Sequence, residues 1–285
     1  MTSCPWPAQR LRKLGDCIRD DRPVPEGTPS YSQAMVWYAD VLTDVQSVIE
    51  NVDWTPLLGE RRPEITSRVK TIDTLRDRLR DQRSMKLPNI QDVAGLRFEA
   101  EMTLAEQDAV ITAIRGCFDH DEAAVHDLRE GDHSGYRAVH LWLRLDARVE
   151  VQVRTHLQSA WANAYEAAGD VLGRSIRYGA IPEAASSAEI VRSMQRISCV
   201  GIARVEDSAV EIQRLALTIH EAEQNLGHVP AHDTEKAAAQ LSETRARLER
   251  MQQAQRGREN DLRSGLDELR DLLIDMHREA RRDAH

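Results

Sequence analysis

The chain has 285 residues, which is enough for one large domain or two modest ones with a real hydrophobic core. Its formal net charge is −9 and 30% of its residues are charged. This balance is typical of a soluble protein and excludes one that coats nucleic acid along its whole surface. With no membrane-length apolar stretch and no secretory signal pattern, we expect a cytoplasmic protein with no membrane partner. Its cysteines, far apart in sequence, are expected to be reduced thiols: Cys4, Cys17, Cys117 and Cys199.

The first third of the chain is predicted to be an arm followed by two helices. Residues 1–30 are rich in Pro, Arg and Asp, so we expect a flexible N-terminal arm with a short helix around residues 11–18. From Ser32 a helical apolar pattern runs to Val48. A second helix is predicted to begin after Pro63 and to end at Pro88. Its expected buried stripe consists of Ile65, Val69, Ile72, Leu75 and Leu79.

Residues 61–86 contain a local excess of positive charge within an acidic protein. Nine Lys or Arg residues stand against four acids in this segment. One interpretation is a solvated helix face with acid–base pairs at helical spacing, and the other is a phosphate-binding site. The spacing favours neither.

Further along, strands and helices alternate, which predicts an α+β or α/β domain. Residues 92–98 are predicted to form a short strand, residues 104–118 an amphipathic helix, and residues 119–134 a polar loop. Another helix is predicted after Thr155.

Between that loop and that helix, the sequence predicts a β-hairpin with one apolar and one polar face. The apolar face takes Val139, Leu141, Leu143, Leu145, Val149, Val151 and Val153. The polar face takes His140, Trp142, Arg144, Glu150, Gln152 and Arg154. If residues 146–148 form the turn, Leu143 lies opposite Val151 and His140 lies opposite Arg154. A one-residue slip would place apolar side chains opposite polar ones.

Residues 183–285 are predicted to form a helical extension. A heptad seam in its second half consists of Leu241, Leu248, Leu262, Leu269 and Met276, flanked by Met251, Leu266 and Leu273. Gln255 interrupts this row. An intramolecular helical hairpin and an arm for homo-oligomerisation both fit the pattern.

Asp92 and Glu150 are the candidate catalytic acids. Each lies in a β-type stretch with a cation nearby, Arg97 and Arg154 respectively. Two strand-borne carboxylates that face one cleft can hold Mg²⁺; the alternative is two surface acids paired with arginines. Tyr136 is either a ring on which a base stacks or a packing residue.

Four motifs occur in order at compatible spacings. They are Arg68-x-Lys70-Thr71, Asp92-x-x-Gly95-x-Arg97, Gly135-Tyr136-Arg137-x-x-His140 and Glu150-Val-Gln-Val-Arg154-Thr155, the last followed by Trp161-Ala162. Together they resemble the synthetase domain of the RelA/SpoT alarmone synthetase family over roughly residues 35–180. The resemblance predicts a synthetase domain at residues 31–182.

The resemblance implies a fold, an activity and a cofactor. The fold would be a mixed, largely antiparallel sheet flanked by helices and related to nucleotidyltransferases. The activity would be transfer of the β,γ-pyrophosphate of ATP to the 3′-OH of GDP or GTP, or of an adenine nucleotide, which makes (p)ppGpp-type alarmones. Mg²⁺ would be held by Asp92 and Glu150.

The resemblance also implies roles for the remaining motif residues. Arg68 would stack on adenine, with Lys70 and Arg78 on the ATP phosphates. Tyr136 would stack on the acceptor base, and His140 with Arg154 would contact phosphates. Glu150 would take the proton from the attacking hydroxyl. Further substrate-binding candidates within the motifs are Thr71, Arg97, Arg137 and Gln152.

Three departures from the family pattern keep the acceptor open. Asp132 stands where family members commonly carry a basic residue, and Tyr165-Glu166 replaces a common Glu-His pair. The family's hydrolase domain has no counterpart here, so we expect synthesis without reversal. Because a tRNA 3′ end has no diphosphate to bind, Asp132 favours an alternative: a toxin that pyrophosphorylates tRNA and is neutralised by an antitoxin. A second alternative is an inactive regulator that acts through the helical extension.

Overall fold

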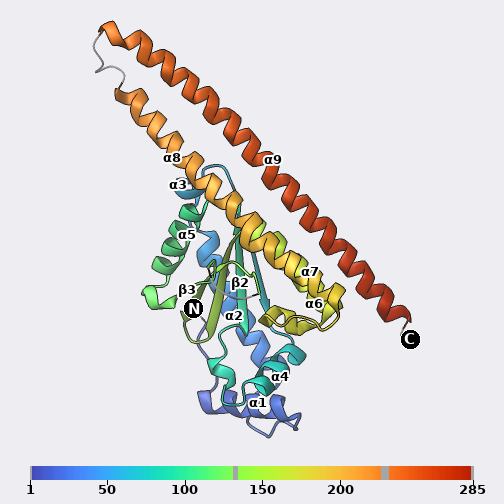
Figure 1. Ribbon diagram of the computed structural model, residues 1–285. Coiled ribbons are helices and arrows are strands. Elements are labelled where there is room, and N and C mark those ends of the chain that lie inside the picture. Colours follow the sequence, from blue (N-terminus) through green and yellow to red (C-terminus); the bar gives the residue numbers. More distant parts are fainter. Residues whose placement is uncertain (1, 131–133, 226–230, 284–285) are drawn as a thin grey trace. The chain divides into compact units, whose positions relative to one another are not determined.

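The computed structural model describes residues 2–130, 134–225 and 231–283, and these form two compact units (Figure 1). The sheet unit comprises Met1–Met102, Glu106–Arg129 and Ala138–Arg154. The helical unit comprises Thr103–Ala105, Glu130–Arg137 and Thr155–His285. The α+β class predicted from the sequence is confirmed.

The sheet unit is built on five strands in the order β1-β2-β5-β4-β3. The strands are β1 (Glu64–Val69), β2 (Ala94–Ala100), β3 (Val125–Asp127), β4 (Val139–Arg144) and β5 (Arg148–Thr155). β1 pairs with β2, β3 with β4, and β4 with β5, all antiparallel. The sheet is therefore largely antiparallel, as expected.

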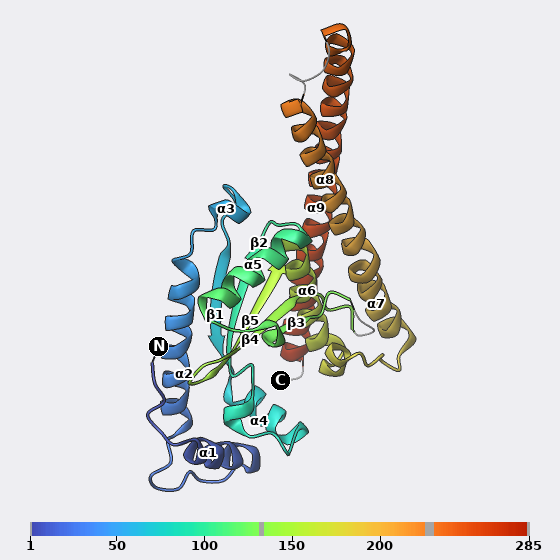
Figure 2. The same cartoon turned by 90° about the vertical axis from the view of Figure 1, so that its left-hand side faces the viewer.

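One face of the sheet is apolar and forms the core of the unit. Because side chains alternate across a strand, every second residue of β2, β4 and β5 is buried on this face. They are Ala94, Leu96, Phe98, Ala100, Val139, Leu141, Leu143, Val149, Val151 and Val153. The helix α2 (Tyr31–Glu50) packs on β1 and β2, and α5 (Leu104–Cys117) adds Val110, Ile111 and Ile114 to the same core (Figure 2). The opposite face is left for polar side chains.

The central hairpin has the predicted faces but not the predicted register. Leu141 pairs with Val151 and Leu143 with Val149, so the turn is residues 145–147 rather than 146–148. The predicted pairing of His140 with Arg154 is wrong, because His140 lies opposite Gln152. A two-residue shift returns every side chain to its original face, so hydrophobic alternation cannot detect it. Ala147 is buried and its carbonyl accepts the Leu145 N–H at 3.1 Å, which closes the shorter turn.

The prediction of one helix from residue 64 to 87 is wrong. Residues 64–69 form the strand β1, and the helix α4 covers only Ile72–Asp81, before a 3₁₀ turn at Leu87–Asn89. Ile65, Thr66 and Val69 are β-branched, which favours a strand. As a strand, residues 64–69 form six pairs with residues of β2. Likewise, the expected loop after α5 contains a 3₁₀ turn (Glu122–Ala124) and β3.

The N-terminal residues form more structure than an arm. The helix α1 (Ala8–Asp20) buries Leu11, Leu14 and Ile18 in the core of the sheet unit. Arg76 of α4 donates to the Ile18 carbonyl at 3.2 Å, and Lys86 contacts Asp16 at 2.9 Å. The short helix α3 (Thr55–Leu58) follows α2.

From Thr155 onward, the described residues of the helical unit form helices joined by short connections. The unit contains α6 (His156–Leu172), a 3₁₀ turn (Arg174–Tyr178), α7 (Ala185–Arg196), a π-helical segment (Ile197–Ile202), α8 (Ala203–Asn225) and α9 (Ala231–Asp283). The helix α9 packs along both α6 and α8 within this chain. An intramolecular helix pair is therefore present.

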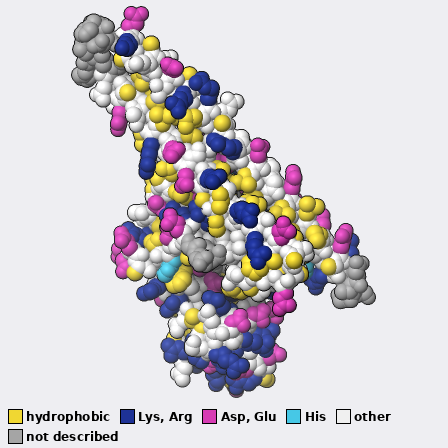
Figure 3. All heavy atoms as spheres, viewed as in Figure 1, with side chains coloured by type: hydrophobic (Ala, Val, Ile, Leu, Met, Phe, Trp, Pro, Cys, Tyr) yellow, Lys and Arg dark blue, Asp and Glu magenta, His cyan; other side chains and the backbone are white. Residues whose placement is uncertain are grey.

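The apolar seam of α9 differs in detail from the heptad row expected. Leu248, Leu266 and Leu273 are buried, whereas Met276 is 54% exposed. Gln255 does not interrupt the seam but lies buried in it. Figure 3 shows basic, acidic and apolar side chains interspersed along the surface of α8 and α9. Within the described ranges, no helix combines the length and apolar character needed to span a membrane.

Candidate active site

A cavity of about 270 Å³ opens on the polar face of the sheet unit. Its walls come from β1, from the turn before β2, and from β2 and β5, which brings three of the four sequence motifs together. The lining residues are Thr66, Ser67, Arg68, Lys70, Asp92, Gly95, Leu96, Arg97, Glu150 and Gln152. Both candidate catalytic acids therefore border one space.

Glu150 lies at the centre of a hydrogen-bonded group on the hairpin. Its carboxylate accepts from Gln152 Nε2 at 2.6 Å and Trp142 Nε1 at 3.3 Å, and His140 Nδ1 lies 3.2 Å from Oε1. Burial raises the pKa of Glu150, but the hydrogen bond and charge of His140, with Gln152 and Trp142, outweigh it and lower the pKa to about 2. The side chain is thus a fixed anion at the edge of the cavity.

The second acid, Asp92, lies in the turn that precedes β2 rather than in the strand that was expected. Its carboxylate forms an ion pair with Lys70 Nζ. The backbone holds this pair in place, because Lys70 N–H donates to the Val93 carbonyl at 2.9 Å and the Tyr31 hydroxyl donates to the Lys70 carbonyl at 2.9 Å. The end of β1 and the turn before β2 are therefore fastened together beside the cavity.

Three cations surround the same space. Arg68 lies opposite Gly95, and Arg97 lies opposite Thr66, in the β1–β2 ladder. Together with Lys70 they give the cavity more positive than negative groups. A Cβ at Gly95 would lie 3.8 Å from the Arg68 carbonyl, which is an ordinary contact. Gly95 therefore leaves the cavity wall without a side chain at this point, although a larger residue would fit the backbone.

The polar face of the hairpin continues the group beyond the cavity lining. Arg154 donates to Gln152 Oε1 at 2.6 Å, so Arg154, Gln152, Glu150 and His140 form one chain of contacts. The contact between His140 and Glu150 depends on the shorter turn. With His140 opposite Gln152, Glu150 is its diagonal neighbour on the adjacent strand. His140 and Arg154 thus belong to the hairpin group.

Two predicted residues of the sheet unit lie outside the cavity lining. Thr71 is the N-cap of α4, and its hydroxyl contacts that of Thr74 at 2.9 Å. Arg78 lies half-buried two turns along the same helix. Of the charged residues at 61–86, Arg61 pairs with Glu106, Arg76 with Asp73 and Asp21, and Lys86 with Asp16. Of these ion pairs, Arg76–Asp73 has the expected helical spacing, and Arg68 and Lys70 line the cavity.

Tyr136 and Arg137 belong to the helical unit. Tyr136 is half-buried and packs against the apolar cluster formed by α6, α7 and α9. Arg137 pairs with Glu206 of α8 at 2.6 Å. Asp132, on which the tRNA alternative depends, lies outside the described residues.

The Tyr165 departure has a structural explanation. Its ring stacks on Trp161 with centroids 4.5 Å apart, and its hydroxyl donates to the Ile176 carbonyl at 3.2 Å. Burial raises the pKa of this hydroxyl. Tyr165 thus packs the helical unit.

Sequence reasoning missed two residues of interest. His126 of β3 lies under Trp142, with ring centroids 3.6 Å apart, and burial lowers its pKa; the expected loop concealed the strand that carries it. Glu206 of α8 is buried four residues after Ile202, within the apolar stripe of its helix. A carboxylate in such a stripe needs a cationic partner, and this signal could have identified it.

Comparison with known proteins agrees with these motifs. Residues 67–169 match the family described as the region found in RelA / SpoT proteins. Uncharacterised proteins of Mycobacterium tuberculosis, strains H37Rv and CDC 1551, and of Mycobacterium bovis are each 42% identical over 222 residues, which is 77% of this chain and 76% of theirs. The chain belongs to the RelA/SpoT family. The protein is accordingly a pyrophosphotransferase of the RelA/SpoT type in its general class.

Solved structures include similar chains. The small alarmone synthetase 1 from Bacillus subtilis is 18% identical, with a TM-score of 0.46 over 66% of this chain and 98% of that one. The same enzyme bound to its product pppGpp is 19% identical, with a TM-score of 0.49 over 64% and 96%. Bound to AMPCPP, it is 17% identical, with a TM-score of 0.44 over 66% and 98%.

Proposed function

We propose that this protein transfers the β,γ-pyrophosphate of ATP to the 3′-OH of a guanine or adenine nucleotide, making a (p)ppGpp-type alarmone in the cytoplasm. The observation that carries the proposal is the cavity bordered by Asp92 and Glu150 together with Arg68, Lys70 and Arg97. Pyrophosphoryl transfer needs neutralised charge and in-line placement more than covalent help. The two carboxylates and three cations around this cavity are suited to neutralising and orienting a triphosphate.

Mg²⁺ fits the anionic groups of this cavity. Asp92 and Glu150 both line it, and the low pKa of Glu150 keeps that carboxylate ionised. A site with few carboxylates suits Mg²⁺, which keeps its other positions for water and phosphate oxygens. When bound, the ion would neutralise charge on the phosphates. Within the described residues, no group of three or more His, Cys, Asp or Glu forms a larger metal cluster.

The cations would bind and orient the triphosphate. We propose that Arg68, which is exposed at the cavity, stacks on adenine, as the family resemblance implies. Lys70, which pairs with Asp92, would contact a phosphate oxygen of ATP. Arg97, Gln152, His140 and Arg154 would contact further phosphate or ribose oxygens, with Thr71 and Arg78 supporting the ATP side.

The role of Glu150 is better described as placement than as proton removal. A carboxylate with a pKa of about 2 is a weak base near neutral pH. It can still accept a hydrogen bond from the attacking 3′-hydroxyl and hold that oxygen in line. The loose transition state of phosphoryl transfer demands little deprotonation in advance.

The test is a transfer assay with purified protein, Mg²⁺ and ATP labelled in its β- and γ-phosphates. GDP, GTP, AMP with ATP, and deacylated tRNA are offered in separate tubes, and Glu150→Gln serves as the inactive control. Label on a guanine nucleotide supports the proposal, and label on an adenine nucleotide alone selects its adenosine version.

Two outcomes would overturn it. Label on tRNA alone, with activity that falls steeply as salt rises, would identify the translation-blocking toxin and direct attention to an antitoxin. Absence of transfer to every acceptor, with a biological effect that survives Glu150→Gln, would identify the inactive regulator.

A further inference from the structure

The strongest feature outside the cavity is the way the helical unit holds the segment Gly135–Arg137. This segment carries the Gly-Tyr-Arg motif and begins four residues before the strand β4. Trp161, Ser198 and Glu206, which contact this segment or lie close to it, belong to the same unit.

Gly135 is enclosed by two helices of the unit. Its φ of +87° lies in the left-handed region that favours glycine. A Cβ at this position would stand 3.1 Å from Gln195 Cα of α7 and 3.1 Å from Trp161 Cζ2 of α6. Trp161 is itself fixed, because its Nε1 donates to the Met194 carbonyl at 2.7 Å. The conformation thus favours glycine, and the space around it is tight for a Cβ.

The π-helical segment makes a direct hydrogen bond to the same residue. The hydroxyl of Ser198, which is 1% exposed, donates to the Gly135 carbonyl at 2.5 Å. A π-helical turn inside a run of α-helix is rare and costs regular hydrogen bonding, so it is usually retained for a reason. Here it places a buried hydroxyl on the Gly-Tyr-Arg segment.

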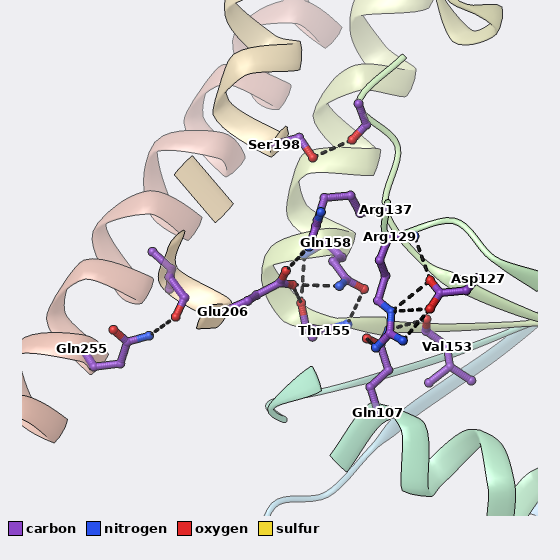
Figure 4. A network of polar contacts seen from close by, with 12 residues as sticks. Gln107, Asp127, Arg129, Arg137, Val153, Thr155, Gln158, Ser198, Glu206 and Gln255 are labelled. Atoms are coloured by element: carbon purple, nitrogen blue, oxygen red, sulfur yellow. Dashed lines mark hydrogen bonds and ion pairs between the residues drawn. The ribbon is translucent and has the colours of Figure 1, made fainter. Parts of the chain in front are cut away.

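The other end of the segment is held by a buried carboxylate of α8. Glu206, 5% exposed, pairs with Arg137 at 2.6 Å and also accepts from Gln158 Nε2 at 2.7 Å and Thr155 Oγ1 at 3.2 Å. Thr155 is the N-cap of α6 and Gln158 completes its capping box. Figure 4 shows Arg137, Gln158 and Thr155 converging on this one carboxylate. Glu206 therefore joins the segment, the start of α6 and α8.

We infer that the helical extension positions the acceptor-binding segment, with Glu206 and Ser198 as positioning residues for Tyr136. The inference rests on the proposed function and on the role that the family resemblance implies for Tyr136, which is to stack on the acceptor base. Tyr136 stands between the two held residues, Gly135 and Arg137, and packs against the apolar cluster of the same unit. Residues beyond 182 then contribute to acceptor binding.

The experiment compares three variants with the full wild-type chain. Glu206→Gln keeps the size of the side chain and removes its charge, Glu206→Asp keeps the charge, and Ser198→Ala removes one hydrogen bond. Gln255→Met is the matched control: Gln255 is 6% exposed, and its Nε2 donates to the Val205 carbonyl at 2.6 Å, but it does not contact the segment. Kinetic constants are measured for ATP and for GDP, or for whichever acceptor takes the label in the transfer assay.

The expected result is a rise of at least about ten-fold in the acceptor KM of Glu206→Gln, because the lost contact is a buried, charged hydrogen bond. The ATP KM should stay within about two-fold, and Glu206→Asp should recover part of the loss. Ser198→Ala should show a smaller rise and serves if Glu206→Gln does not fold. An unchanged acceptor KM, or an equal rise in Gln255→Met, would overturn the inference.

Hydrogen exchange separates this inference from the proposed function. Amides of Gly135–Arg137 should exchange faster in Glu206→Gln than in wild type or Gln255→Met, whether or not the protein transfers pyrophosphate. A wild-type protein without transferase activity would defeat the proposed function alone. Equal exchange rates in Glu206→Gln and wild type would defeat the claim that Glu206 holds the segment.

Discussion

Two buried carboxylates, one in each unit, show how similar chemistry serves different ends. Glu150 on β5 and Glu206 on α8 are 8% and 5% exposed, and both are surrounded by hydrogen-bond donors. Glu150 borders a cavity that Asp92 and three cations share. Glu206 is enclosed by Arg137, Gln158 and Thr155, all from its own unit. The first carboxylate borders an open cavity, and the second joins separate parts of the chain.

The sharpest test of this contrast is to neutralise the carboxylate at the cavity. Glu150→Gln should lower kcat/KM by on the order of 10³-fold, because it removes a fixed charge from the reacting groups. Circular dichroism should show an intact fold. Glu64→Gln, at an exposed end of β1 outside the cavity, is the control and should retain activity. Comparable activity in the two variants would remove Glu150 from the site.

Acid should weaken the folded protein through the same side chain. Glu150 has a pKa of about 2 when folded, against an ordinary value of 4.5, so it stabilises the folded state above pH 4.5. This contribution is lost as pH falls through the folded pKa. Between about pH 5 and about pH 2, without Mg²⁺, the wild type should lose on the order of 3 kcal/mol more free energy of unfolding than Glu150→Gln. Urea titrations across this range measure it, and parallel curves would contradict it.

In the helical unit, Gly135→Ala should lower the free energy of unfolding by about 2 kcal/mol, since alanine is strained at a positive φ and its Cβ would crowd Gln195 and Trp161. Gly257→Ala is the control, because a Cβ there meets nothing within 4 Å. Alanine should stabilise α9 at that position. Denaturant unfolding measures both changes. If Gly135→Ala stabilised the protein and Gly257→Ala destabilised it, the segment would not be held as described.

The smallest expected effect concerns nucleotide binding. Arg68→Ala should raise the ATP KM by about ten-fold, the range expected for one stacking contact with a base. Arg62→Ala, an exposed change outside the cavity lining, should leave the ATP KM unchanged. If both variants bind ATP equally well, adenine lies elsewhere.

Much of the sheet unit could be predicted from local pattern. The two faces of the hairpin follow from strict alternation, and so does the grouping of Glu150, Gln152 and Arg154. The register could not be predicted, because a two-residue shift leaves the faces unchanged. Residues 64–69 were mistaken for helix because Ile65 and Val69 also fit a helical spacing, and only the partner strand β2 decides between the two.

The helical secondary structure of this unit could be predicted from the sequence, but its contacts with the Gly135–Arg137 segment could not. Helices after residue 182 follow from composition, but the contact that gives α8 its role joins Arg137 and Glu206 across 69 positions of sequence. No local rule connects such residues. The π-helical segment that orients Ser198 likewise leaves no trace in the apolar pattern.

Gln255 gives α9 a defined longitudinal alignment. A 53-residue helix with leucines at heptad spacing can slide by seven residues and still cover the same apolar strip. The Nε2 of Gln255 reaches the Val205 carbonyl in only one of these positions. If α9 slid, the buried amide would lose this hydrogen bond, at a cost of about 1–3 kcal/mol. One amide in an otherwise apolar seam therefore fixes the axial position of α9, at the cost of some apolar packing.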